Sequence, residues 1–411
     1  MHALYSFLVH IAWFFLKLIA LIKPKIKLFV DGRKNVFSDL SDSITSTDKV
    51  IWMHVASLGE YEQGLPILQK LKRLYPNHKL LLTFFSPSGY EVKKNTPFAD
   101  IVTYLPLDTI TNAKRFIKQV NPKMAIFIKY EIWPNYLNTL KKNKVPTFLA
   151  SALFSKKQVY FKWYGSFMRK SLKAFDHFFV QDSNSKKALN SIGFNNVTVS
   201  GDTRFDRVSE ILDQNNELDF MNAFKQNKFC VVVGSSWPED EKIIADFINT
   251  SAEDIKFVIA PHDIKNEHLK SLTERLTKKT ACYSQRESKP LENYDVLIID
   301  TIGLLTKIYS YADMAYVGGG FKTGLHNTLE PAVFGIPIII GPNYSGFKEA
   351  EDLVNSGGVL SIKNEVEFLK TINNLLTNES LMKSTGKINS KYVSSNTGAT
   401  IKFLNHIDPR I

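Results

Sequence analysis

Apolar runs of strand length alternate with segments of helical periodicity along most of this chain. VIWMHVAS precedes the helical pattern EYEQGLPILQKLKRLY, and a polar stretch near residues 213–228 separates this first series from a second that starts at FCVVVGSS. Because the runs are apolar throughout, with no polar residue at every second position, they predict parallel strands covered by helices on both faces. A length of 411 residues is too long for one ordinary core. We therefore predict an α/β protein with two doubly wound parallel-sheet domains that face a central cleft.

The pattern also sets the expected boundaries. We predict a membrane-anchor helix over 1–30, an N-terminal α/β domain over 31–206, a linker over 207–228 and a C-terminal α/β domain over 229–411. Within the first domain, a longer basic helical region is expected from Val159 to Phe175.

The start of the chain predicts contact with a membrane. Leu4 to Ile22 is a mostly apolar run that is long enough to span a bilayer, although His10 and Lys17 interrupt it. Basic residues follow it, which favours a cytoplasmic location for the rest of the chain. A helix that lies on the membrane, or a hydrophobic helix of the fold, fits the same pattern. The net charge of +12 fits an anionic membrane surface or substrate better than nucleic acid, since the basic residues are spread along the chain and form no dense Lys/Arg tract interleaved with stacking aromatics.

Polar residues follow three predicted strands of the first domain. Glu60 lies at a helix start after VIWMHVAS, Glu131 follows MAIFIKY, and Arg204 follows VTVSG. An ionised glutamate at a helix start can take a proton from an attacking hydroxyl, but it can equally be a first-turn stabilising residue. Glu131 is either a site residue packed on Trp133 or a solvated loop residue. Arg204 can bind a phosphate or carboxylate, or form an inter-domain salt bridge with Asp202 or Asp206.

The second domain carries its strongest motif in AYVGGGFKTGLHNTLEPAVFGIPIIIGP, residues 315–342. Gly318 to Gly320 permit close backbone approach, and Asn327 with the amides of a helix start can hold a phosphate. Glu330 can accept hydrogen bonds from a ribose diol. The stretch therefore predicts a nucleotide-sugar pocket. The turn Gly234 to Ser236 could bind an anion, but alone it is a weak signal because the lysine of a P-loop is missing.

Taken together, the motifs resemble those of the Kdo (3-deoxy-D-manno-octulosonic acid) transferase family. ASLGE matches A-S-x-G-E, and YEIWPN and VSGDTRFD resemble E-x-E-x-W-P-N and G-N-x-K-F-D. GLHNTLEPAVFGIPIIIGP closely matches G-G-H-N-x-L-E-P-A-x-x-G-x-P-x-x-x-G-P, and the segments TFFSPSGYE and YLPLD match further strand ends. The likeness extends over nearly the whole chain, including the apolar start.

The resemblance implies a GT-B fold and an inverting, metal-independent transfer of Kdo from CMP-Kdo to a lipid A precursor (lipid IVA) at the cytoplasmic face of the inner membrane. Glu60 would be the general base, and Glu131 and Arg204 would help to stabilise the transition state. The donor would be held by Pro261, His262, Ile302, Gly303, Leu304, Asn327, Thr328, Leu329 and Glu330. No cofactor and no nucleic-acid partner is implied, and the sequence does not indicate an oligomeric state.

Several positions depart from the family pattern. Arg204 stands in place of a lysine and Lys129 in place of the first glutamate of E-x-E. His262 replaces an arginine, Leu304 replaces a glutamate, and Trp237 replaces the histidine of G-S-T-H. These changes affect the expected donor and acceptor contacts but leave Glu60 in place. Two alternatives remain open on the sequence: another GT-B enzyme, such as a nucleotide-sugar epimerase or a UDP-sugar transferase, and a non-catalytic membrane-surface protein.

Overall fold

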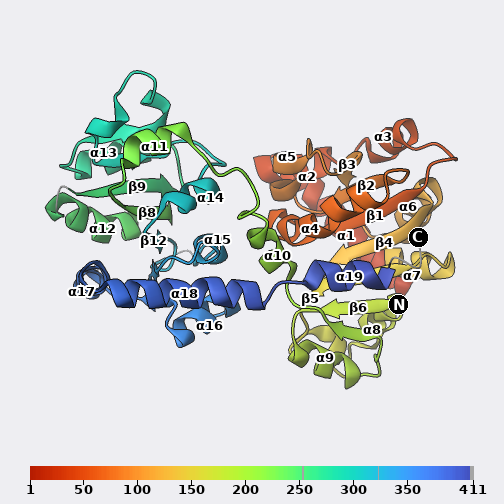
Figure 1. The fold of residues 1–411 in the computed structure, drawn as a ribbon. Helices are drawn as coiled ribbons and strands as arrows, with labels where there is room; N and C mark the ends of the chain where they lie inside the picture. The colour runs from red at the N-terminus through yellow and green to blue at the C-terminus, as the bar shows by residue number, and fades with distance from the viewer. Residues whose placement is uncertain (252–253, 323, 408–411) are drawn as a thin grey trace. The chain divides into compact units, whose positions relative to one another are not determined.

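The computed structural model describes residues 1–251, 254–322 and 324–407. The chain divides into two compact units (Figure 1). Unit 1 contains Met1–Arg207 together with the segment that begins at Thr397, and unit 2 contains Val208–Asn396. Each unit is an α/β domain with its own parallel sheet, as the alternating pattern predicts.

Unit 1 is built around a seven-stranded sheet with the order β3-β2-β1-β4-β5-β6-β7. Its strands are β1 (Val50–Val55), β2 (Lys79–Phe84), β3 (Ile101–Tyr104), β4 (Pro122–Ile128), β5 (Thr147–Ala152), β6 (His177–Val180) and β7 (Val197–Val199). Its helices are α1 (His2–Ile19), α2 (Pro24–Asp31), α3 (Val36–Ser43), α4 (Leu58–Leu74), α5 (Pro87–Lys93), α6 (Ile110–Val120), α7 (Pro134–Lys142), α8 (Ser166–Leu172), α9 (Ser183–Asn190), α10 (Thr203–Ser209) and α19 (Ala399–Ile407), with a 3-10 turn η1 (Val159–Phe161).

Both faces of this sheet are buried, which explains the unbroken apolar runs. In β1, Val50 and Trp52 belong to the hydrophobic cluster on one face, and Ile51 and Met53 belong to the cluster on the other. All the strand pairings are parallel, so the carboxyl ends of the strands lie along one edge of the sheet. The order reverses between β1 and β4, and such a switch point is where doubly wound sheets bind ligands.

The end of the described chain differs from the predicted boundary. Helix α19 was expected in the C-terminal domain, but it belongs to unit 1. Phe403, Leu404 and Ile407 are buried in the cluster that contains strand residues of β1, β2, β4 and β5. Apolar periodicity shows that a helix has a buried face, but it does not show which sheet covers that face.

Unit 2 contains a second seven-stranded parallel sheet with the order β10-β11-β9-β8-β12-β13-β14. Its strands are β8 (Phe229–Ser236), β9 (Ile255–Pro261), β10 (Thr280–Cys282), β11 (Val296–Ile298), β12 (Met314–Val317), β13 (Ile338–Ile340) and β14 (Val359–Ser361). Its helices are α11 (Asp219–Lys225), α12 (Pro238–Thr250), α13 (Asn266–Arg275), α14 (Leu305–Ile308), α15 (Leu329–Ala332), α16 (Lys348–Ser356), α17 (Glu365–Thr377) and α18 (Glu379–Ser395), with 3-10 turns η2 (Tyr283–Gln285), η3 (Leu291–Asn293) and η4 (Tyr309–Tyr311). Here the order reverses between β8 and β12.

Two further expectations differ from the structure. The segment expected to be a linker, 207–228, contains helix α11, whose Met221 and Phe224 are fully buried, so much of it belongs to unit 2. The basic region from Val159 to Phe175 is not one helix, because η1 and α8 are separated by a turn at residues 162–165. Gly165 ends this turn where a side chain would collide with the carbonyl oxygen of Val159.

Candidate active site

The predicted site residues of unit 1 lie at the carboxyl edge of its sheet. Glu60 follows β1 and Glu131 follows β4, so these two carboxylates flank the switch point. Arg204 follows β7, at the far end of the strand order. Each of these residues follows a different strand of one parallel sheet, so residues that are far apart in the sequence lie along the same edge.

Glu60 occupies the first turn of α4 and caps it. Its Oε2 accepts hydrogen bonds from the amides of Ala56 at 2.7 Å and Ser57 at 3.1 Å. The stabilising role that the sequence left open is thus present. Among the described residues, every hydrogen bond to Glu60 ends on Oε2, and the side chain is only partly buried. The geometry leaves Oε1 free of the capping bonds.

The pKa of Glu60 lies above its ordinary value. Burial is the main cause, and the negative charge of Glu131 adds to it. The amides of Ala56 and Ser57 and the charge of Lys129 oppose the shift. A carboxylate with a raised pKa is a stronger proton acceptor than an ordinary glutamate, which is the property a general base needs.

Glu131 is buried and held by a chain of hydrogen bonds through the sheet. The indole of Trp133 donates to its Oε2 at 2.8 Å, and Nε2 of His54 lies 3.2 Å from the same oxygen. Nδ1 of His54 lies 2.8 Å from the hydroxyl of Thr83, which accepts from the indole of Trp52 at 2.8 Å. Nδ1 of His54 also lies 3.1 Å from the carbonyl oxygen of Thr83, which can only accept, so Nδ1 donates there. The indole of Trp133 also donates to Nε2 of His54, at 3.1 Å. This chain, which we call the Trp52–Glu131 relay, fixes Glu131 in orientation.

His54 is fully buried in β1 and is not among the site residues predicted from the sequence. The signal was present, since His54 is the polar residue within the otherwise apolar run VIWMHV. Its partner Thr83 lies opposite it on β2, in the parallel register His54 to Thr83.

Arg204 is held by a carboxylate of its own unit. Asp202 accepts from Nε of Arg204 at 2.9 Å and lies 2.9 Å from Nη2, so the contact is an ion pair within unit 1. Gln63 also donates to Asp202, at 3.2 Å. Burial, and then the charge of Glu60, raise the pKa of the Tyr130 hydroxyl, and Arg204 opposes this shift. Tyr130 is therefore within electrostatic reach of both Glu60 and Arg204.

In unit 2, the three glycines after β12 allow the protein's own segments to approach one another. A side chain at Gly318 would meet the carbonyl oxygen of Ser235 at 2.4 Å, and one at Gly320 would meet the backbone of Gly341 at 2.8 Å. Gly319 has a φ of 91° and donates its amide to the buried carboxylate of Asp240 at 2.9 Å. The turn after β8 is also internally bonded, since the Ser236 hydroxyl donates to Glu241 at 2.8 Å.

Three aromatic rings meet at the switch point of unit 2. The indole of Trp237, after β8, donates to Nε2 of His326, after β12, at 3.1 Å, and the two rings lie within 16° of parallel. His262, after β9, lies 4.4 Å from Trp237 and 4.7 Å from His326 between ring centroids. Trp237 and His326 are hydrogen-bonded edge to edge, so these distances place the His262 ring against the faces of both rings, near the hydrogen bond that joins them. We call this group the Trp237–His262–His326 cluster.

The cluster holds His326 in its neutral form. Burial first, and His262 second, lower the pKa of His326 to about 4. Acceptance of the indole proton at Nε2 leaves the ring proton of the neutral form on Nδ1, where it can be donated. Trp237 and His262 are two of the positions that depart from the family pattern, and they are in contact.

Asn327, Thr328 and Glu330, which are predicted to bind the donor substrate, also follow β12 at the carboxyl edge of the sheet. Glu330 accepts from the Asn327 amide at 3.0 Å and from the Thr306 hydroxyl at 2.9 Å, so α15 and the start of α14 are joined through this carboxylate. The Asn327 side chain also accepts the Leu329 amide at 3.0 Å. Thr328 is buried and its hydroxyl has no hydrogen-bond partner among the described residues.

The other residues predicted to bind the donor substrate lie at the ends of β9 and β11. Pro261 is buried at the end of β9, and Ile302, Gly303 and Leu304 follow β11. Ile302 is 86% exposed. Helix α15 has only four residues, so the macrodipole expected to favour a phosphate contributes little there. Among the described residues, no group of three His, Cys, Asp or Glu side chains could hold a metal ion.

Comparison with known proteins identifies the family. A sequence profile described as "3-Deoxy-D-manno-octulosonic-acid transferase (kdotransferase)" matches residues 32–207. A 3-deoxy-D-manno-octulosonic acid transferase of Aquifex aeolicus is 30% identical over 344 residues, which cover 82% of this chain and 88% of the relative. The chain belongs to the Kdo transferase family. A second Kdo transferase, from Rickettsia prowazekii, is 28% identical over 383 residues, or 90% of this chain and 82% of the relative. The protein is therefore a glycosyltransferase.

A solved structure supports the GT-B fold expected of a Kdo transferase. UDP-GlcNAc 2-epimerase from Neisseria meningitidis, bound to UDP-GlcNAc, aligns with a TM-score of 0.64 over 87% of this chain and 99% of its own. At 15% sequence identity this likeness concerns the fold alone.

Proposed function

We propose that this Kdo transferase moves Kdo from CMP-Kdo to the lipid A precursor lipid IVA in lipopolysaccharide core biosynthesis, with inversion at the anomeric carbon. The observation that carries the proposal is Glu60, a capped and partly buried carboxylate of raised pKa at the β1/β4 switch point. Family membership supports Kdo as the transferred sugar. The chemistry of the residues at the carboxyl edges of the two sheets supports the roles assigned to them below.

In the proposed reaction, Glu60 accepts the proton of a glucosamine hydroxyl of lipid IVA. The hydroxyl oxygen forms a bond to the anomeric carbon of Kdo while the bond from that carbon to the phosphate oxygen of CMP breaks. Capping of Oε2 leaves Oε1 as the oxygen that takes the proton. The raised pKa of Glu60 makes this transfer more favourable than it would be for an exposed glutamate.

Glu131 and Arg204 are assigned to the transition state. The Trp52–Glu131 relay fixes the orientation of the Glu131 carboxylate, which would face the positive charge that develops on the sugar ring. Asp202 orients the guanidinium of Arg204, which would face the anionic groups of the reacting substrates.

Unit 2 is assigned to CMP-Kdo. Glu330 and Asn327 would contact the ribose and phosphate, and His326 would donate from Nδ1 to an anionic oxygen of the donor. His262 would contact the donor in place of the arginine of other family members. Pro261, Ile302, Gly303, Leu304, Thr328 and Leu329 shape the same edge of the sheet. The proposed reaction uses no metal.

The enzyme is assigned to the cytoplasmic face of the inner membrane. Helix α1 has the length and composition to enter a membrane, and among the described residues it is the one helix that does. Its large apolar side chains are mostly exposed, which disfavours the interpretation of α1 as a helix of the protein core.

A transfer assay with CMP-Kdo and lipid IVA tests the proposal. Purified enzyme should give a product whose mass shows the number of Kdo units added. Glu60→Gln should lower the rate at least ~100-fold while its melting temperature stays close to that of the wild type. Glu62→Gln is the matched control, because Glu62 lies on the same helix and forms surface ion pairs with Lys93 and Arg207. Near-normal turnover of Glu60→Gln would remove the mechanism.

The alternatives that the sequence left open give different results. An epimerase or a UDP-sugar transferase would be stabilised against heat by UDP more than by CMP, whereas the proposal predicts the opposite order. A non-catalytic protein would give no product in the assay with either donor.

A further inference from the structure

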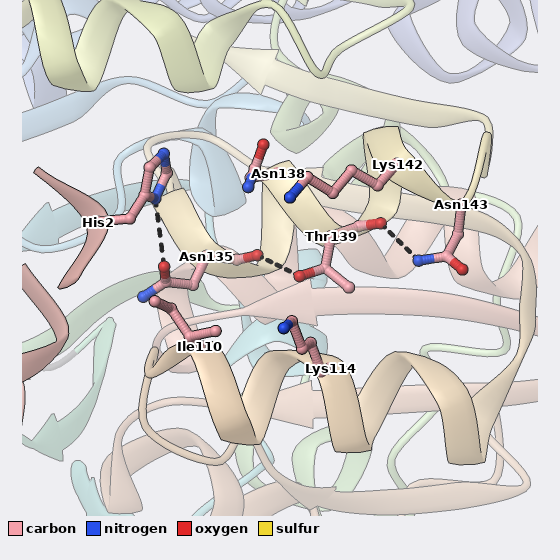
Figure 2. A pocket seen from close by; sticks show the side chains of 8 residues that line it. All are labelled: His2, Ile110, Lys114, Asn135, Asn138, Thr139, Lys142 and Asn143. Carbon is pink, nitrogen blue, oxygen red and sulfur yellow. Dashed lines mark hydrogen bonds between the residues drawn. The ribbon is translucent and has the colours of Figure 1, made fainter.

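Both ends of the α1 region are fixed to unit 1. In the first turn of α1, Nδ1 of His2 lies 3.3 Å from Oδ1 of Asn135 (Figure 2). Ser6 is buried and accepts from the Asn135 amide at 3.1 Å and from the amide of Ile110 at 3.3 Å. The start of α1 is therefore bonded to α6 and α7.

The segment that follows α1 is fixed at the same edge of the sheet. Arg33, just after α2, donates to the carbonyl oxygens of Phe85 at 2.6 Å and Leu105 at 2.9 Å, which follow β2 and β3. Its guanidinium also lies 3.8 Å from the ring centroid of Phe29 on α2, and Phe29 contacts Trp13 of α1.

A helix of 18 residues is about 27 Å long, close to the thickness of the hydrocarbon core of a bilayer. If α1 crossed the membrane, its two ends would lie on opposite sides. Because the start of α1 and Arg33, which lies 14 residues after its end, are both bonded to one folded unit, crossing would require one set of these contacts to break or the chain to return through the bilayer within 14 residues. The geometry fits a helix that lies along the membrane surface.

A second exposed apolar element lies beside the start of α1. Trp163 is 91% exposed and Tyr164 is 61% exposed, in the turn between η1 and α8. Phe167, in the first turn of α8, packs against His2 and Tyr5 of α1, with ring centroids 4.9 Å and 5.6 Å apart. The turn is held in shape because Arg169 donates to the carbonyl oxygens of residues 160 and 162, each at 2.8 Å.

The charge around these elements has one sign. From residue 155 to residue 175 the sequence contains no acidic residue, and its cations are Lys156, Lys157, Lys162, Arg169, Lys170 and Lys173. Two more lysines, Lys114 and Lys142, line a hollow of about 340 Å³ next to His2 (Figure 2). Among the described residues, neither of these two lysines has an acidic partner. Tryptophan and tyrosine flanked by lysine are typical of contact with the interface of an anionic bilayer.

We propose that the exposed apolar side of α1 and the Trp163–Tyr164 turn form one membrane-binding surface, on which α1 lies flat along an anionic bilayer and the two aromatic rings enter the interface as a second contact. The partner is a phospholipid surface whose headgroup phosphates meet the lysines, and the enzyme is thereby attached without a segment that crosses the membrane. This inference concerns attachment and does not depend on the proposed reaction.

Flotation of the full chain with vesicles tests the surface. Binding to vesicles of phosphatidylethanolamine with phosphatidylglycerol should exceed binding to pure phosphatidylcholine and should weaken as salt is raised. The double variant Trp163→Ala/Tyr164→Ala should bind the anionic vesicles at least ~10-fold more weakly. Leu212→Ala/Val366→Ala is the matched control, because it removes two exposed apolar side chains of unit 2, and it should bind as the wild type does. Unchanged binding of the Trp163 variant would overturn the role of the turn and would point to a protein partner for it.

The depth of α1 is measured separately. Nitroxide labels on cysteines placed one at a time at Phe7, Phe15 and Ile22, in a Cys282→Ser background, should all report similar shallow depths. These three side chains are exposed, so the labels leave the contacts of α1 intact. A depth profile that is greatest at Phe15 and falls toward both ends would show a helix that crosses the bilayer and would overturn the proposal. The two experiments have no catalytic readout, so failure of Kdo transfer would leave their outcome unaffected.

Discussion

Glu60 shows how one residue can serve both stability and chemistry. Its Oε2 accepts from the amide of the N-cap residue Ser57, a group that a helix leaves without an intrahelical partner, and from the amide of Ala56 just before it. The second oxygen takes no part in the cap. The stabilising and catalytic interpretations of the sequence are therefore compatible, and the cap holds the proposed base in a fixed orientation.

The charges around Glu60 predict opposite effects of two substitutions on the pH profile. Lys129 lowers the pKa of Glu60 and Glu131 raises it. Since the base must be deprotonated to act, the acidic limb of kcat/KM follows the pKa of Glu60. Lys129→Met should move this limb to higher pH, and Glu131→Gln should move it to lower pH while also slowing the reaction. Rate measurements over the acidic range with Lys118→Met as the control, a lysine on the surface of α6, would check this. Shifts of the same sign in both variants would mean that the limb belongs to another group.

The position of Glu60 could be predicted from the sequence, but the environment of Glu131 could not. A carboxylate at a helix start after an apolar strand is a local pattern. The Trp52–Glu131 relay depends on which residue of β2 lies opposite His54, and this register is set by the packing of the whole sheet. Likewise, the contact of Trp237 with His262 and His326 joins three loops that are far apart in the sequence.

At the scale of elements, the strands were predictable and the partners of the helices were not. A fully buried parallel strand needs an unbroken apolar run, which is visible in the sequence. A helix needs only one apolar face, and α19 shows the consequence, since its buried residues pack on the sheet of unit 1 although α18 before it belongs to unit 2. The basic region from Val159 to Phe175 is broken by the turn at residues 162–165, which Gly165 permits because a side chain there would collide with the carbonyl oxygen of Val159.

The packing of α19 predicts a localised loss of stability. Phe403 is 1% exposed and lies 4.8 Å from the ring of Phe179 on β6. Phe403→Ala removes a buried ring and should lower the free energy of unfolding of unit 1 by about 3–5 kcal/mol. Ile401→Ala, at a residue of the same helix that is 61% exposed, should change it by less than ~0.5 kcal/mol. Hydrogen exchange should accelerate in β5 and β6, and acceleration confined to unit 2 would contradict the assignment of α19.

At the scale of the whole molecule, both units have a switch point in their strand order, but the side chains at the two switch points differ. In each, the strand order reverses beside the first strand of the sheet, between β1 and β4 in unit 1 and between β8 and β12 in unit 2. The switch point of unit 1 carries carboxylates, which suit proton transfer and charge stabilisation. The switch point of unit 2 carries aromatic rings and histidines, which suit a nucleotide. Chemistry and donor binding are therefore expected to be separable by mutation.

This separation is the last prediction. Glu60→Gln should abolish transfer while CMP protects it against heat as well as it protects the wild type, because the nucleotide is assigned to unit 2. His326→Ala should lower CMP affinity at least ~10-fold, since it removes a donor from the proposed phosphate contact and leaves the Trp237 indole without its acceptor. In the wild type, CMP at 100 times its dissociation constant should add about 2.7 kcal/mol of stability, with slower hydrogen exchange near residues 236–237, 261–262 and 326–330. Val366→Ala is the control for both measurements. The Val366 side chain is exposed, and it lies on α17, which is distant in the sequence from these loops. Loss of CMP protection in Glu60→Gln would show that the two functions are not divided between the units as proposed.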